Sequence, residues 1–301
     1  MVWRRRRGER RRRAHDLTNA PPRLEGCPSV GSAAMAQPAG MAAWAVMPTS
    51  LTVDQHLEAV AARTAVVADI VGGVDLAADV PTCPGWSLYD LVAHLSGVHR
   101  WATAQVLGER EADPGPMFAA PAEAAALVAW LTEGAGRLME ALRSAPDDLE
   151  ALRFLNDAPA PRPFWARRQA HETTIHSVDA QAAALGRTPA GGETGIHREL
   201  AVDGLDELLN GFLPRERSQL RHPSPIRVAV VATDSAAAFT VDISEGPPVT
   251  RASADVDADL ILTADARALY LGLWNRGEEL AATGNPDVLD QWRRDMRVRW
   301  S

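Results

Sequence analysis

Glutamate and histidine side chains that can bind a divalent metal stand at a helical spacing in the segment His-Glu-Thr-Thr-Ile-His, residues 171–176. Glu172 and His176 are four residues apart, so on a helix they lie about 40° from each other on one face and can share a ligand. His171 and His176 are five residues apart, which places them about 140° from each other on a helix. These two histidines therefore cannot chelate one ion from a regular helix.

A metal site of this kind needs a third ligand from another element, because catalytic zinc sites usually take three protein ligands and an exchangeable water. His94 is the better candidate, since apolar neighbours at helical spacing place it near the inward side of its predicted helix. His99 lies about 140° from His94 around the axis of the same helix. We therefore predict a divalent metal of zinc type bound by His94, Glu172 and His176. The alternative interpretation is a hydrogen-bonded core histidine and an ordinary i, i+4 contact.

Other polar residues in the same segments could assist a metal site or bind a substrate. Asp179 follows His176 by three residues and could orient it through a hydrogen bond, or could be an ordinary exposed acid. Arg167 and Arg168 could bind an anionic substrate or cofactor, although arginines beside acidic residues commonly form solvated ion pairs. Cys83 is followed by Pro-Gly, which favours a structural turn over a nucleophile. Trp86 is expected to be a core residue.

The helices that must hold these residues are predicted from caps and apolar periodicity. Thr52 and Gln55 have the spacing of a capping box, and Ser87 can cap a second helix with Asp90 in its first turn. Four helices are expected, at about 52–71, from Ser87 onward, 121–143 and 163–186. Helices joined by moderate loops form a bundle, so we predict a metal-binding four-helix bundle over residues 47–195.

β-branched runs predict a different architecture after this bundle. A helix is expected at about 196–212, followed by strands at 226–231, 239–243, 249–253 and 260–263 and by helices at 265–275 and 286–295. Thr233-Asp234-Ser235 separates the first two strands as a hairpin turn. The predicted fold class is therefore α+β with two domains, the bundle followed by a small α+β domain over residues 196–301.

The first 46 residues differ from the rest, with near-continuous arginine at 4–7 and 10–13. They are predicted to be a disordered Arg-rich leader, or the product of a misassigned start codon with initiation at Met35, Met41 or Met47. The remaining residues carry 22 Arg against 36 Asp plus Glu, a net charge of −14, which argues against nucleic-acid binding.

Two further features of the composition bear on the cell compartment. Apolar runs are too short for a membrane helix, which needs roughly 20 residues. Two cysteines in 301 residues form no disulfide framework. We therefore expect a cytoplasmic protein with no membrane partner.

Several segments resemble the mycothiol-dependent maleylpyruvate isomerase family, within the DinB-like superfamily of metal-binding bundles. They are Pro-Thr-Cys-Pro-Gly-Trp-Ser at 81–87, Asp-Leu-Val-Ala-His-Leu at 90–95 and His-Glu-Thr-Thr-Ile-His-Ser-Val-Asp-Ala at 171–180. The stretches 258–263 and 269–276 resemble the second domain of that family. The similarity covers about residues 50–300.

The resemblance implies a zinc-type ion bound by His94, Glu172 and His176, the set already predicted from spacing. It also implies mycothiol as co-substrate, with its sulfur at the open position of the metal. A metal-bound thiol deprotonates readily and becomes a nucleophile at neutral pH. The expected activity is isomerisation or conjugation of a small electrophile. A metal-dependent hydrolase on the same bundle and a non-catalytic binding or regulatory protein remain alternatives.

Overall fold

The structure is a computed structural model that describes residues 51–109, 114–156, 158–253, 255 and 257–296. The predicted leader over residues 1–46 and its three candidate start methionines lie outside the described residues. Among the described residues, no helix is both long and apolar enough to cross a lipid bilayer.

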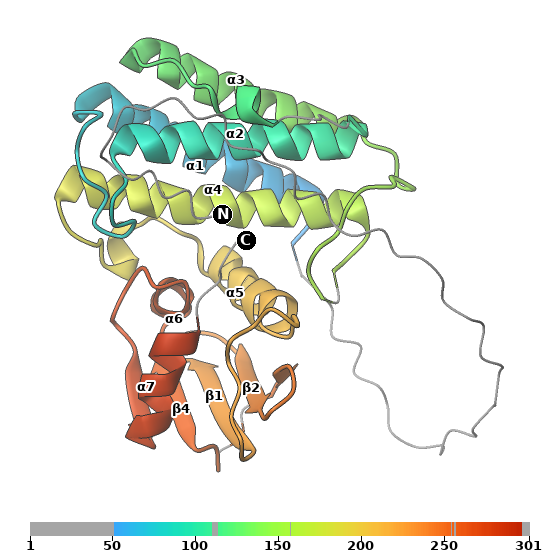
Figure 1. The fold of residues 1–301 in the computed structure, drawn as a ribbon, viewed down its shortest axis with the longest axis vertical. Helices are drawn as coiled ribbons and strands as arrows, with labels where there is room; N and C mark the ends of the chain where they lie inside the picture. The colour runs from blue at the N-terminus through green and yellow to red at the C-terminus, as the bar shows by residue number, and fades with distance from the viewer. Residues whose placement is uncertain (1–50, 110–113, 157, 254, 256, 297–301) are drawn as a thin grey trace, which may run out of the picture.

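Four long helices pack side by side as the predicted bundle (Figure 1). They are α1 (Val53–Gly73), α2 (Leu88–Leu107), α3 (Ala124–Ser144) and α4 (Pro161–Leu185). The predicted capping box of Thr52 and Gln55 is present, and the predicted cap Ser87 also forms a capping box with Asp90. The predicted start of the third helix at Pro121 was wrong, because the Glu123 carboxylate accepts hydrogen bonds from the first free backbone N–H groups and caps the helix there.

Helix α4 is buried along most of its length because it has neighbours on two sides. One side contacts α1 in the bundle, while Ile175 and Val178 pack in the same apolar cluster as the core of the C-terminal domain. A helix with two buried sides does not show the single apolar stripe of a surface helix. The 25 residues of α4 therefore place polar side chains in the interior, where they must find polar partners.

The predicted helix at 196–212 consists of two parts. Helix α5 (Arg198–Asp206) continues into a π-helical segment, η3 (Glu207–Phe212). Helices α5 and α6 (Ala266–Leu273) lie between the bundle and the sheet, as Figure 1 shows. Two short 3-10 turns are η1 (Gly115–Phe118), beside α2, and η2 (Gly191–Glu193), after α4.

The C-terminal domain is built on a five-stranded sheet in the order β3-β2-β1-β4-β5. The strands are β1 (Ile226–Ala232), β2 (Ala238–Ile243), β3 (Val249–Arg251), β4 (Leu260–Ala264) and β5 (Ala281–Gly284), and α7 (Pro286–Asp295) follows them. The predicted hairpin is β1 and β2, paired antiparallel, whereas β1 and β4 are parallel. The predicted α+β two-domain fold class is therefore confirmed.

Candidate metal centre

The structure brings together the three side chains that were predicted to bind a metal. His94 comes from α2, and Glu172 and His176 come from α4. Glu172 Oε1 lies 3.4 Å from His94 Nε2 and 3.3 Å from His176 Nε2. The candidate ligand atoms all lie within 4.8 Å of one another.

This set of donors fits a divalent ion of zinc type, because two imidazole nitrogens and one carboxylate oxygen are a common catalytic zinc set. Glu172 Oε2 and His176 Nδ1 have protein partners outside the site, so Glu172 Oε1 and His176 Nε2, which face each other, are the atoms that could bind an ion. Glu172 Oε2 accepts a hydrogen bond from Arg168 at 3.3 Å, and His176 Nδ1 lies 2.9 Å from Asp179 Oδ2. The side chains of His94, Glu172 and His176 keep 8%, 14% and 11% exposure, so the site is largely but not completely buried.

Asp179 fixes the orientation of His176. It is fully buried, and its carboxylate also accepts hydrogen bonds from Arg276 at 3.0 Å and from Thr82 at 2.5 Å. A carboxylate on Nδ1 selects the tautomer whose Nε2 lone pair can bind a metal. The contact of Asp179 with His176 agrees with the prediction from their spacing, whereas Arg276, which follows α6, reaches the site only through the fold and was not predicted.

Opposing effects set the charges of these groups in the metal-free protein. Burial lowers the pKa of His176, but hydrogen bonds to Asp179 and Glu172 outweigh burial and raise this pKa to about 9. Burial opposes ionisation of Glu172, yet its hydrogen bonds with His176 and His94 hold its pKa well below the ordinary value. Burial lowers the pKa of His94. At neutral pH the metal-free site therefore holds a carboxylate, a neutral His94 and a protonated His176.

Two aromatic side chains form a wall beside the histidines. The Trp86 ring centroid lies 5.0 Å from that of His94, edge to face, and 6.4 Å from that of His176, stacked. Phe118, from η1, lies 6.4 Å from the His94 ring. Trp86 also packs against the bundle core, as expected, so it belongs to both the core and the site. A wall of this kind limits the access of water to the ligand atoms.

Cys83 lies at the edge of the same network. Its Sγ is 3.5 Å from Arg276 Nη2. Burial, followed by the negative charge of Asp179, raises the pKa of the Cys83 thiol to about 12. A thiol that stays protonated is a poor nucleophile, which supports the structural interpretation of this residue.

Two family models match this chain over both of its domains. The mycothiol maleylpyruvate isomerase N-terminal domain matches residues 56–181, and the MDMPI C-terminal domain matches residues 199–291. The chain belongs to the mycothiol-dependent maleylpyruvate isomerase family. The resemblance found in the sequence is thereby confirmed, and so is the prediction of an enzyme at the level of this family.

Solved structures of a family member share the fold. Crystal structures of mycothiol-dependent maleylpyruvate isomerase, one of a histidine-to-alanine mutant and one without that description, match with TM-scores of 0.53 and 0.52. Each is 14% identical to this chain and covers 77% of it, while 93% of the solved chain is covered. No curated protein sequence gives a significant match.

The two arginines predicted to hold an anionic group are buried and face protein carboxylates. Arg167 contacts Asp203 and Asp206, at 3.1 and 2.8 Å. Arg168 contacts Glu172 and also Glu207. Binding of a substrate or cofactor by this pair stays a prediction, and such a ligand would have to compete with the protein's own carboxylates.

His56, His171 and Asp203 form a second group of potential metal ligands, which was not predicted from the sequence. Asp203 Oδ2 lies 3.1 Å from His56 Nε2, 2.7 Å from His171 Nε2 and 3.1 Å from Arg167 Nε. Three donors around one oxygen make a hydrogen-bond network, and the cationic guanidinium disfavours a metal ion at that place. His171 Nδ1 continues the network to the Tyr270 hydroxyl at 3.0 Å. This network joins the bundle to α5 and α6.

The remaining histidine of α2, His99, lies apart from the candidate ligands. Its Nε2 is 2.9 Å from Thr173 Oγ1, and complete burial lowers its pKa to about 3. His99 is therefore neutral and bonded within the core, which agrees with the choice of His94 from helical geometry.

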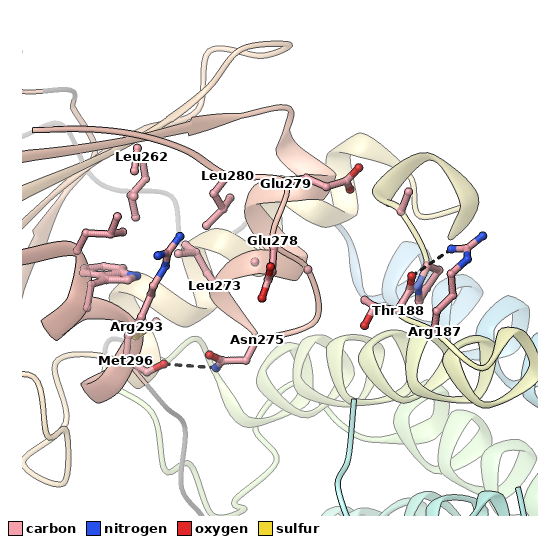
Figure 2. Close-up of a pocket in the computed structure, with 17 residues that line it drawn as sticks. Arg187, Thr188, Leu262, Leu273, Asn275, Glu278, Glu279, Leu280, Arg293 and Met296 are labelled. Carbon is pink, nitrogen blue, oxygen red and sulfur yellow. Dashed lines mark hydrogen bonds between the residues drawn. The ribbon is translucent and has the colours of Figure 1, made fainter. Parts of the chain in front are cut away.

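A cavity of about 740 Å³, lined by the C-terminal domain and by residues 187–190 after α4, is separate from the candidate metal centre. Figure 2 shows its apolar side, with Leu262, Leu273 and Leu280, and the charged side chains Glu278 and Arg293 near it. None of the three candidate metal ligands lines this cavity. It therefore adds no group to the chemistry at the bundle.

Proposed function

We infer that this chain is a metal-dependent enzyme that uses mycothiol as co-substrate to isomerise or conjugate a small electrophile. The observation that carries this proposal is the convergence of one ligand atom each from His94, Glu172 and His176 within 4.8 Å, in a member of an isomerase family named for this thiol. The metal we propose is Zn²⁺. Use of a free thiol suits the reducing cytoplasm, where we expect the protein to act.

The residues around the site have distinct tasks in this proposal. His94, Glu172 and His176 would hold the cation, which when bound would lower the pKa of the mycothiol thiol so that thiolate is available at neutral pH. Asp179 keeps the proton of His176 on Nδ1 and so directs Nε2 toward the site. Trp86 limits access of water to the nucleophile.

The chemistry of isomerisation requires no net transfer of atoms to the enzyme. The thiolate adds to the carbon–carbon double bond of a cis-enedione acid and leaves an enolate. Rotation about the carbon–carbon bond that was the double bond, followed by departure of the thiolate, gives the trans isomer and regenerates the thiolate. In conjugation the same thiolate adds to an electrophile or displaces a leaving group from it, and the product keeps the sulfur. Both reactions need the same thiolate, so the ligand geometry is compatible with either one.

Metal content and thiol-dependent turnover test the proposal together. The full chain, His94→Ala and the control His99→Ala are purified without chelator, analysed for metals, and assayed with maleylpyruvate in the presence and absence of mycothiol. We expect about one zinc-type ion per chain and mycothiol-dependent isomerisation in the wild type and in His99→Ala, and loss of both in His94→Ala.

Other results would favour the alternatives. Metal-dependent turnover of an ester or amide without thiol would indicate a hydrolase. Wild-type protein without a stoichiometric ion and without turnover would indicate a binding protein. Metal retained in His94→Ala would show that the site assignment is wrong.

A further inference from the structure

We propose that Glu207, in the C-terminal domain, is a positioning residue for the candidate metal ligand Glu172 and acts on it through Arg168. The inference rests on the proposed metal site and adds to it a residue that touches neither metal nor substrate. It makes the orientation of the carboxylate ligand, and the positive charge of Arg168 that acts on it, depend on a different domain from the one that carries all three ligands.

The contacts form a continuous chain from one domain to the other. Glu172 presents Oε1 to the two histidines, and its Oε2 is 3.3 Å from Arg168 Nη2. The other terminal nitrogen of Arg168, Nη1, donates to Glu207 Oε2. Both Arg168 and Glu207 are 2% exposed, so water does not screen either pairing.

Aromatic rings of the C-terminal domain hold the Arg168 guanidinium in this position. Its central carbon lies 5.2 Å from the Phe212 ring centroid and 5.6 Å from that of Trp274. These distances are within the range of cation–π attraction. An arginine held on two aromatic rings and one buried carboxylate has few other positions, so it presents a fixed donor to Glu172.

The backbone that supplies this support departs from a regular helix at the same place. Glu207 is the first residue of the π-helical segment η3 and Phe212 is its last. Asp203 and Asp206, in the preceding turn of α5, contact Arg167 instead. π-helical turns occur frequently at functional sites. Here the changed register lets one short segment provide both the carboxylate and a ring to Arg168.

Charge explains why metal binding should depend on Glu207. With both carboxylates present, Arg168 divides its attraction between Glu172 and Glu207. Without the Glu207 charge, the whole positive charge of Arg168 acts on Glu172 in a buried environment, where electrostatic interactions are strong. The Arg168 guanidinium would then compete with the metal for the Glu172 carboxylate, and its positive charge would repel a divalent ion nearby.

Glu207→Gln tests this proposal because it removes the charge and keeps the size of the side chain. Asp206→Asn is the matched control, since it neutralises the adjacent carboxylate, which is paired with Arg167. Zinc dissociation constants are measured for the full-length proteins by competition with a chromophoric chelator, without thiol or substrate, together with the thermal midpoints of the metal-free proteins. Glu207→Asp, which keeps the charge, is the conservative variant.

We expect Glu207→Gln to weaken zinc binding by about 10- to 100-fold, the usual effect of losing an outer partner of a metal ligand. Asp206→Asn should bind zinc close to the wild-type value, and Glu207→Asp should recover most of the loss. A Glu207→Gln protein with a lowered midpoint but the wild-type zinc constant would overturn the inference, as would equal losses in Glu207→Gln and Asp206→Asn. If Glu207→Gln does not fold, wild-type-like zinc binding by Glu207→Asp would support the inference, and a loss as large as that of His94→Ala would overturn it. Absence of zinc binding by the wild type would instead refute the proposed function.

Discussion

Metal binding should release one proton from His176, and the apparent affinity should therefore depend on pH. In the metal-free protein the pKa of His176 is raised to about 9 by Asp179 and Glu172 against the opposing effect of burial. A metal needs the unprotonated Nε2, so at any pH below this value it must first remove the proton. The association constant should rise about tenfold per pH unit from pH 7 to pH 9, a total of about 100-fold or 2.7 kcal/mol. Above pH 9 the increase should stop.

The assay is calorimetric titration with zinc at pH 7.5 in buffers of different ionisation enthalpy, supported by chelator competition between pH 6.5 and pH 9.5. The dependence of the binding heat on the buffer gives the number of protons released on zinc binding, and we expect about one proton per ion. Asp179→Asn is the informative variant, because loss of its charge should lower the pKa of His176 and weaken the pH dependence above pH 7. An affinity that is constant between pH 7 and pH 9 with no proton release in the wild type would refute the assigned protonation state.

Three further predictions concern the neighbourhood of the site. An ideal Cβ at Gly97 would lie 2.1 Å from Phe118 Cδ1, so Gly97→Ala should displace this ring. The substitution should lower the unfolding free energy by about 1–3 kcal/mol and raise KM more than it lowers kcat. An unchanged midpoint of urea unfolding would contradict the packing argument. His56→Ala leaves buried Asp203 without one donor and should cost about 1–3 kcal/mol of stability while metal content stays at the wild-type level, as checked by urea unfolding and elemental analysis. Cys83→Ser should fold and keep its metal, and loss of activity without loss of stability would give Cys83 a direct role at the site.

Local sequence spacing was sufficient to predict which candidate ligands lie close together, because two of them are on one helix. Glu172 and His176 are four residues apart on α4, and periodicity alone favoured His94 over His99 on α2. Asp179, one turn beyond His176, was found for the same reason. The four helices of the bundle could also be predicted, since their caps and apolar stripes are encoded within each segment.

The partners of these ligands could not be predicted because they depend on contacts between distant segments. Arg276 reaches Asp179 from 97 residues away along the chain, and Glu207 reaches Arg168 from 39 residues away. The π-helical segment has no periodicity signal of its own, so one helix was expected over 196–212. Strand β5 was missed because its four residues are exposed and form a sheet edge, which has neither alternation nor β-branched enrichment.

These distant contacts give the C-terminal domain a direct part in the geometry of the candidate metal centre. Both ligands on α4 are held from that domain, Glu172 by Glu207 through Arg168 and His176 by Arg276 through Asp179. A buried helix must find partners for its polar side chains, and α4 finds several of them in the C-terminal domain and others on α2. Stability of the domain contact and orientation of the ligands are therefore linked, because the same buried ion pairs provide both. A domain that merely covered the bundle would need apolar contacts only, whereas this one supplies charged groups to two of the three candidate ligands.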